Sequence, residues 1–160
     1  ILIFRDPVER AWSQWCMDYA RGAEWLPFAR TIREGRDRLG GLASRADERR
    51  VFSYVERGAY GAQLARALTL LPRRQLLLLR SQDLARDPAR TLTQVSDFLG
   101  IAPFGPGPFL RENVRIPMAW PALPVEADRA HIMEELGEEL ALFARLSGLD
   151  VTGWGQVVPA

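Results

Sequence analysis

Two short, continuously apolar segments constrain the fold of this chain most strongly: residues 1–4 and the leucine run within residues 75–80. Uninterrupted apolar runs of this length are typical of strands that are buried on both faces of a parallel sheet. Helical patterns lie between the two segments and after the second one. The order of elements therefore predicts a small α/β arrangement with parallel strands.

Capping residues mark where the first helix begins and ends. Asp6 is a typical N-cap, Pro7 suits the first helical position, and Glu9 completes a capping box. Gly22 should stop this helix. Apolar periodicity predicts further helices over residues 26–39, 59–71, 88–99 and 125–147, a short helix ending near residue 58, and an irregular proline-rich segment over 101–124.

A sheet of two strands is too small to stand alone, so each strand should have neighbours in a wider sheet. We find no internal repeat and no second domain in the 160 residues. We therefore expect residues 1–160 to be a single domain, the carboxyl-terminal portion of a larger one, with part of the sheet upstream.

Composition excludes several chemistries. All 21 residues counted as Lys or Arg are Arg, so the chain offers no lysine Schiff base and no phosphate-binding loop that ends in lysine. One cysteine and one histidine exclude a disulfide framework and argue against a metal site. His131 is expected at the surface. A net charge of +1 gives no nucleic-acid footprint, and no apolar run approaches the roughly 20 residues of a membrane span.

The nine residues Arg-Asp-Pro-Val-Glu-Arg-Ala-Trp-Ser, from Arg5 to Ser13, carry the clearest chemical signal. Arg5 follows a predicted strand at its carboxyl end, where ligands bind in open α/β sheets. Ser13 lies about two turns into the next helix. A guanidinium and a hydroxyl that converge near a helix N-terminus suit a phosphate monoester. A capped turn with a salt bridge is the plainer alternative.

This motif resembles the 3′-phosphate-binding motif of sulfotransferases that use 3′-phosphoadenosine-5′-phosphosulfate (PAPS). The spacing from Arg5 to Ser13 matches that family, and further similar blocks follow in the same order. The chain looks like the carboxyl-terminal half of bacterial sulfotransferases and of domains that act on heparan-type glycans. The later blocks are Arg57-Gly58-Ala59-Tyr60, Leu71 to Leu79, Asp83-Leu84, Asp87-Pro88, Asp97 to Gly100 and Leu146 to Trp154.

The resemblance implies a P-loop-NTPase-like, three-layer α/β domain with a parallel sheet, here mostly helical. It also implies PAPS as the donor, 3′-phosphoadenosine-5′-phosphate (PAP) as the product, no metal, and a bacterial, cytoplasmic protein. Arg5 and Ser13 would bind the 3′-phosphate. Tyr60 would either line the nucleotide pocket or pack in the core. Arg111 or Arg115 would contact the nucleotide from a late loop, unless that loop is simply solvated.

The chain also departs from the family. The family's loop rich in Lys, Gly, Ser and Thr, which holds the 5′-phosphosulfate, has no counterpart here, and neither does its catalytic base. The resemblance therefore implies no catalytic residue within residues 1–160; the base is expected upstream. We expect these residues alone to hold the 3′-phosphate without transferring sulfuryl groups.

Two other functions stay open at this stage. A nucleotide kinase-like P-loop relative would share the sheet and a phosphate-binding arginine. A non-enzymatic module could instead bind an anionic partner through the arginines at 30, 33, 36 and 38, although a solvated helix face explains them more simply. The acceptor of a sulfotransferase is equally open, because a hydroxyl or amine of a glycan, a lipid or a small molecule would serve.

Overall fold

The structure is a computed structural model that describes residues 1–40, 52–105, 107 and 120–156. None of the described helices is both long enough and apolar enough to cross a bilayer. The elements, in chain order, are β1 (Leu2–Phe4), α1 (Pro7–Ala20), α2 (Phe28–Gly40), the 3₁₀ helix η1 (Glu56–Gly58), α4 (Tyr60–Leu70), the 3₁₀ helix η2 (Arg73–Gln75), β2 (Leu78–Arg80), α5 (Ser81–Arg86), α6 (Pro88–Leu99), α7 (Glu126–Glu135) and α8 (Gly137–Ser147).

Strands β1 and β2 form a two-stranded parallel sheet whose register places Phe4 opposite Arg80. The predicted parallel pairing is confirmed. Within these 160 residues only one face of β1 is buried, because Ile3 is 52% exposed whereas Phe4 is 8% exposed, so the expected burial on both faces within a wider sheet stays a prediction. Phe4 points into the helical core, where its ring centroid lies 4.5 Å from that of Phe143. The described helices thus bury one face of β1 and leave the other open.

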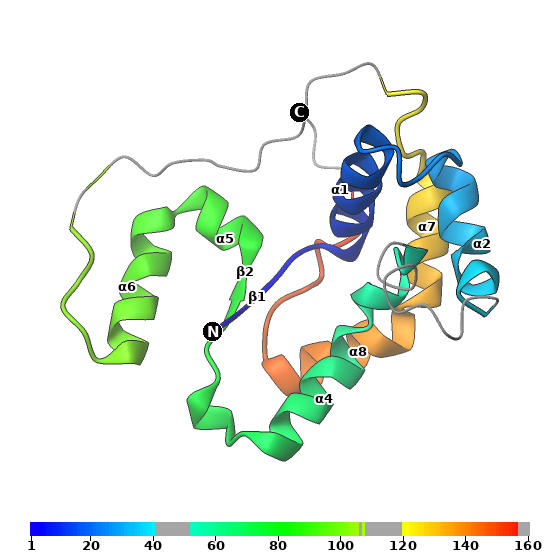
Figure 1. The fold of residues 1–160 in the computed structure, drawn as a ribbon. Helices are drawn as coiled ribbons and strands as arrows, with labels where there is room; N and C mark the ends of the chain where they lie inside the picture. The colour runs from blue at the N-terminus through cyan, green and yellow to red at the C-terminus, as the bar shows by residue number, and fades with distance from the viewer. Residues whose placement is uncertain (41–51, 106, 108–119, 157–160) are drawn as a thin grey trace.

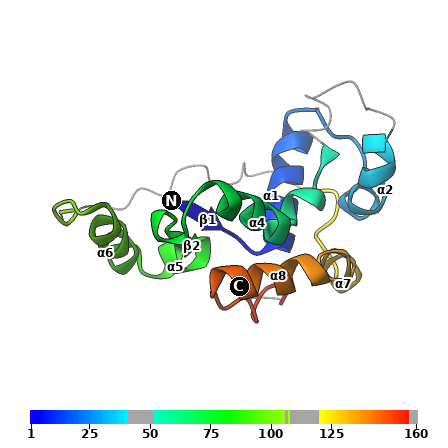
Figure 2. The ribbon, with the colours of Figure 1, turned by 90° about the horizontal axis from the view of Figure 1, so that it is seen from below.

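The helices gather at the two ends of this sheet. Helices α1, α2 and α7 lie together on one side, α4 and α8 lie side by side, and α5 and α6 extend from the other side (Figure 1). Seen from below, α6 and α2 occupy opposite ends of an elongated molecule (Figure 2). The turn from β1 to α1 therefore lies near the middle of the molecule, between the sheet and its largest group of helices.

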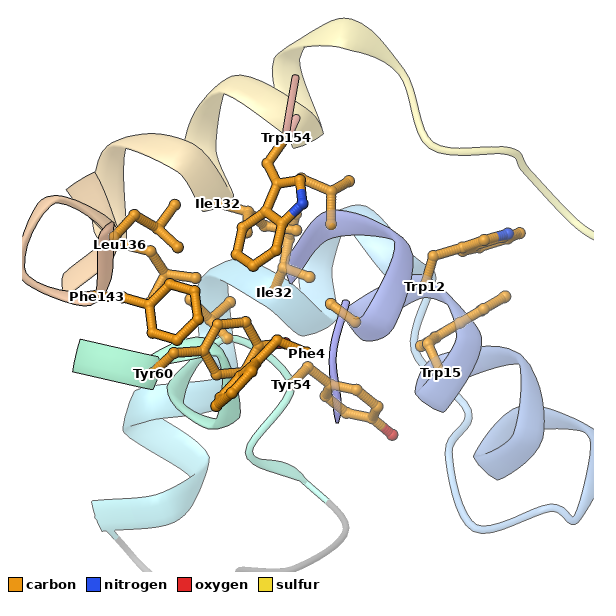
Figure 3. Close-up of a cluster of buried hydrophobic side chains, with 14 of the residues drawn as sticks. Phe4, Trp12, Trp15, Ile32, Tyr54, Tyr60, Ile132, Leu136, Phe143 and Trp154 are labelled. Atoms are coloured by element: carbon orange, nitrogen blue, oxygen red, sulfur yellow. The ribbon is translucent and has the colours of Figure 1, made fainter. Parts of the chain in front are cut away.

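One core joins β1, α1, α2, α4, α7, α8 and the carboxyl-terminal turn. Burying a large apolar side chain stabilises a fold by about 1.5–3 kcal/mol, so this aromatic-rich cluster holds the β1–α1 turn firmly against the helices. Its centre is shown in Figure 3, with Phe4, Trp12, Trp15, Ile32, Tyr54, Tyr60, Ile132, Leu136, Phe143 and Trp154 labelled.

Most predicted helix boundaries are confirmed to within about two residues, because local capping chemistry sets them. Helix α6 is an example: the Asp87 side chain accepts from Arg90 N at 3.0 Å, and Gly100 ends the helix with φ +65°. A non-glycine residue would be strained at that φ. The short helix expected near residue 58 is η1.

The single helix predicted over residues 125–147 is wrong, since the structure has two helices, α7 and α8. The chain leaves helical geometry at Leu136 (φ −103°, ψ 4°), immediately before Gly137. Glycine is a poor helix former, which makes this a natural place for a break. Helix α5 was not predicted; it begins directly after β2 with Ser81.

Candidate functional site

Arg5 lies between the last residue of β1 and the first turn of α1. Its Nε donates to Glu9 Oε2 at 3.1 Å, and its side chain is 40% exposed. Within the described ranges, its two terminal nitrogens have no hydrogen-bond partner. The structure therefore confirms the predicted place of Arg5 at the carboxyl end of a strand and leaves part of its guanidinium available to an anion.

Asp6 fixes the backbone next to Arg5. Its Oδ1 accepts from Val8 N at 2.8 Å and from Glu9 N at 3.3 Å, as an N-cap should. Its Oδ2 accepts from Gly155 N at 2.5 Å, which ties the carboxyl-terminal turn to this site. The predicted capping box is not completed, because the Glu9 carboxylate binds the Arg5 guanidinium instead.

Ser13 lies on α1 and is half-buried. Residues four apart share one helix face, so Glu9 and Ser13 lie on one strip of α1, and Arg5, which precedes the helix, joins that strip through its bond to Glu9. The Arg5–Glu9 pair occupies the first half of this strip, and no described hydrogen bond joins Arg5 to Ser13. Serines inside helices often bond to a carbonyl one turn back, yet the Ser13 hydroxyl has no hydrogen-bond partner among the described residues. It too is available to a ligand.

Tyr60 lies in the core beside Arg5 and is only 6% exposed. Its ring centroid lies 5.2 Å from that of Phe4 and 5.9 Å from that of Trp154. Its hydroxyl donates to the backbone carbonyl of Arg5 at 3.0 Å. Burial raises the pKa of Tyr60, which keeps this hydroxyl neutral. The geometry fits the core-packing alternative and makes Tyr60 a support for Arg5; its contact with a nucleotide stays a prediction.

The structure draws attention to a second guanidinium in the same motif, that of Arg10, for which the sequence predicted no role. Arg10 Nη1 donates to Gln14 Oε1 at 2.9 Å, and its Nη2 donates to the Tyr54 carbonyl. Its Nε is buried and has no hydrogen-bond partner in the described part of the chain, and burial lowers the pKa of Arg10. Both acceptors are neutral, so no described carboxylate bonds to this cation. In the sequence, the one signal for Arg10 is that it lies within the same motif, five residues after Arg5.

Arg80 provides a contrast at the end of the neighbouring strand. Its Nε and Nη2 donate to the two carboxylate oxygens of Asp83 at 2.7 and 2.9 Å, and its Nη1 donates to the Asp150 carbonyl at 2.6 Å. This guanidinium is fully engaged in a structural role. Of the two arginines at the carboxyl ends of the strands, only Arg5 is therefore open to an external anion.

The arginines of α2 do not form a free basic patch, because each one is paired with a carboxylate. The alternative, a solvated helix face, describes these arginines only in part. One pair lies within α2, and the others link α2 to α7 and to the turn before α2. The pairs are Arg30–Glu34 at 2.7 Å, Arg33–Asp128 at 2.7 Å, Arg36–Glu135 at 2.9 Å and Arg38–Glu24 at 2.8 Å.

The remaining candidate residues lie elsewhere. Arg111 and Arg115 fall outside the described residues, so their contact with a nucleotide stays a prediction. His131 is half-buried, with Nε2 3.3 Å from the Ile32 carbonyl oxygen, so the predicted surface position is confirmed only in part. It lines a small cavity between α2, η1 and α7 that includes neither Arg5 nor Ser13. No described group of three His, Cys, Asp or Glu side chains could hold a metal ion.

Comparison with known proteins shows similarity to sulfotransferases. No family model matches the chain. Two human proteins, heparan sulfate glucosamine 3-O-sulfotransferases 3B1 and 3A1, are each 33% identical to it over 103 residues, or 63% of this chain. The chain spans only 24% and 23% of their lengths. The fold matches a sulfotransferase from Alicyclobacillus acidocaldarius with a TM-score of 0.75 and 21% identity, over 96% of this chain and 56% of that one.

The mostly helical fold with its small parallel sheet is thus the α/β fold of a sulfotransferase, as the resemblance implies. The sequence similarity to two sulfotransferases agrees with the fold. The chain is thus similar to sulfotransferases both in sequence and in fold.

Proposed function

We propose that the protein is a PAPS-dependent sulfotransferase in which Arg5 and Ser13 bind the 3′-phosphate of the donor. One observation carries this proposal. Arg5, at the junction of β1 and α1, and Ser13, farther along the same strip of α1, both keep polar groups without a described partner. In a chain with the sulfotransferase fold, these two groups are best placed to take up a phosphate.

The chemistry of the two groups fits a phosphate monoester. A guanidinium binds phosphate through parallel N–H donors, and a serine hydroxyl adds one further donor. Glu9 holds Arg5 at Nε, which orients the guanidinium while its terminal nitrogens stay open. The partial positive charge at the N-terminus of α1 favours an anion at the same place.

In the proposed reaction, the acceptor oxygen or nitrogen attacks the sulfur of PAPS. A new bond forms to sulfur, and the bond from sulfur to the 5′-phosphate oxygen breaks, so PAP leaves with that electron pair. The acceptor proton passes to a base, and we assign this role to no residue of the chain. Arg5 and Ser13 would hold the nucleotide so that its sulfuryl group is in line for attack, which makes their contribution one of orientation and binding.

The acceptor would carry a hydroxyl or an amine. The two human relatives act, by name, on a glucosamine of heparan sulfate, which supports a glycan over a lipid or a small molecule. The ion pairing of the α2 arginines counts against the non-enzymatic anion-binding module. The similarity to sulfotransferases likewise counts against a nucleotide kinase. A bacterial source and a cytoplasmic location stay predictions from the resemblance.

Titration calorimetry of the purified protein with PAP tests the proposal. Losing one charged hydrogen-bond partner of a phosphate costs about 1.5–3 kcal/mol, so Arg5→Ala and Ser13→Ala should each lower the PAP affinity about tenfold or more. Arg66→Ala is a matched control, because Arg66 is exposed on α4 and has no ion pair with a described residue. Affinities equal to wild type in both site variants would refute the site assignment, and a wild-type protein that does not bind PAP would refute the function.

A further inference from the structure

The segment from Tyr54 to Tyr60 wraps around the turn between β1 and α1. At its start, the Tyr54 carbonyl accepts from the Arg10 guanidinium. At its end, the Tyr60 hydroxyl donates to the Arg5 carbonyl at 3.0 Å. The segment is thus anchored on the phosphate-binding motif on both sides of Arg57, which lies between the two contacts.

Gly58 brings this segment into close contact with the first residue of α1. A Cβ added at Gly58 would lie 3.2 Å from Pro7 Cβ and 2.5 Å from Leu136 Cδ1. Because there is no room for a side chain, the backbone next to Arg57 packs directly against the N-terminus of α1. The Arg57 side chain therefore starts beside the helix end that carries Arg5.

Carboxylates lie near Arg57, but among the described residues none is bonded to it directly. Arg57 is exposed and has no ion pair with a residue that the structure describes. The adjacent Glu56 lies toward α2, where it is 3.9 Å from Arg36. The buried Arg10 is bonded to neutral acceptors only. Burial is the main cause of its lowered pKa; the charges of Arg57 and Arg5 lower that pKa further, whereas those of Tyr60 and Glu56 raise it. Among the described residues, Glu9 is the only carboxylate bonded directly to any of the guanidiniums of Arg5, Arg10 and Arg57.

We propose that Arg57 is a further donor-binding residue, which contacts the same 3′-phosphate as Arg5, and that the buried Arg10 positions the segment that carries it. This inference rests on the proposed function. An exposed guanidinium without a bonded carboxylate is open to an external anion. A 3′-phosphate, with close to two negative charges and three acceptor oxygens, can accept from Arg5 and Arg57 together.

The test compares PAP with adenosine 5′-monophosphate (AMP), which lacks the 3′-phosphate, by calorimetry on the purified protein. Arg57→Ala should lower the affinity for PAP about tenfold and leave the affinity for AMP unchanged, while Arg66→Ala should change neither. Arg57→Lys should recover part of the PAP affinity because it restores the charge. The double variant Arg5→Ala/Arg57→Ala should lose less than the product of the two single losses, because both residues contact one phosphate.

The outcomes separate this inference from the function on which it rests. If Arg5→Ala weakens PAP binding while Arg57→Ala behaves like Arg66→Ala, the role of Arg57 is refuted and the proposed function stands. Equal losses of PAP and AMP affinity in Arg57→Ala would refute the assignment of this residue to the 3′-phosphate. If the wild-type protein binds no PAP, the proposed function itself fails.

Discussion

Replacing Tyr60 with Phe removes one buried hydroxyl and leaves the aromatic ring in place. The ring should keep its contacts with Phe4, Phe143 and Trp154, whose centroids lie between 5.2 and 5.9 Å away. Only the 3.0 Å hydrogen bond to the Arg5 carbonyl is lost. Tyr60→Phe therefore isolates the contribution of that one bond to stability and to the site.

The magnitude follows from the surroundings of the bond. A neutral buried hydrogen bond contributes about 0.5–1.5 kcal/mol, and a buried acceptor left without a partner costs about 1–3 kcal/mol. Because Arg5 is partly exposed, water can reach this region, and we expect a loss near the lower end, about 1–1.5 kcal/mol. For a domain of this size, each 1 kcal/mol lowers the Tm by about 2–4 °C.

Urea unfolding and PAP calorimetry on the same variant distinguish the two roles of Tyr60. If Tyr60 only supports Arg5, Tyr60→Phe should reduce stability and keep the PAP affinity within about threefold of wild type. If Tyr60 bonded the ligand directly, losing that neutral hydrogen bond would cost up to about 1.5 kcal/mol, which lowers the PAP affinity more than tenfold. Tyr19→Phe is the control: its ring stacks on Trp15 at 4.8 Å, but its hydroxyl has no described partner. Unchanged stability with a tenfold loss of PAP affinity would refute the supporting role and make Tyr60 a nucleotide ligand.

Two further substitutions probe packing and a buried charge. Gly61→Ala should lose about 1–3 kcal/mol of stability, because its Cβ would lie 2.5 Å from the Glu139 carbonyl oxygen, whereas Gly137→Ala, with open space around it, should stay within about 0.5 kcal/mol of wild type. Burial raises the pKa of Asp18 in the folded protein above its ordinary 3.8. When the pH is above this raised pKa, the buried carboxylate is ionised and lowers the free energy of unfolding. This loss of stability disappears as the pH falls below 3.8, because the carboxyl is then protonated in both the folded and the unfolded protein. Asp18→Asn keeps an acceptor for the Tyr54 hydroxyl and should be more stable than wild type at about pH 7 but not at about pH 3. Urea unfolding measures the stability of the glycine variants and of Asp18→Asn. If the stability gain of Asp18→Asn over wild type were larger at low pH than at about pH 7, the raised pKa of Asp18 would be contradicted.

The parts of the fold that local chemistry sets were predictable from the sequence. Asp6 and Asp87 cap helices by bonding to nearby backbone N–H groups, and Gly100 ends one by adopting a left-handed φ. Each of these signals involves residues only a few positions apart, so the local sequence contains all the information that sets the helix end. The same locality explains why the place of Arg5 after a strand was found.

The parts that depend on distant partners were not predictable. The apolar stripe of the last helix continues across the break at Leu136, so periodicity conceals that break; Gly137 was the one local hint. The arginines of α2 resembled a basic patch because their partners, such as Asp128 for Arg33, lie far away in the chain. Burial on both faces of residues 1–4 stays a prediction for a related reason: a pattern of residue types does not say which neighbours cover a strand, and within these 160 residues one face of β1 is open.

The candidate site joins these two kinds of information. The motif itself is local, but Arg5 is held by contacts from Tyr60 and, through Asp6, from Gly155, which lies 149 residues away. A binding group held in place before its ligand arrives loses less conformational entropy on binding. Substitutions in these distant supports should therefore lower stability and weaken phosphate binding only slightly, within about threefold, without touching the phosphate. The motif thus predicts which groups bind a ligand, whereas the contacts that hold those groups in place come from the fold.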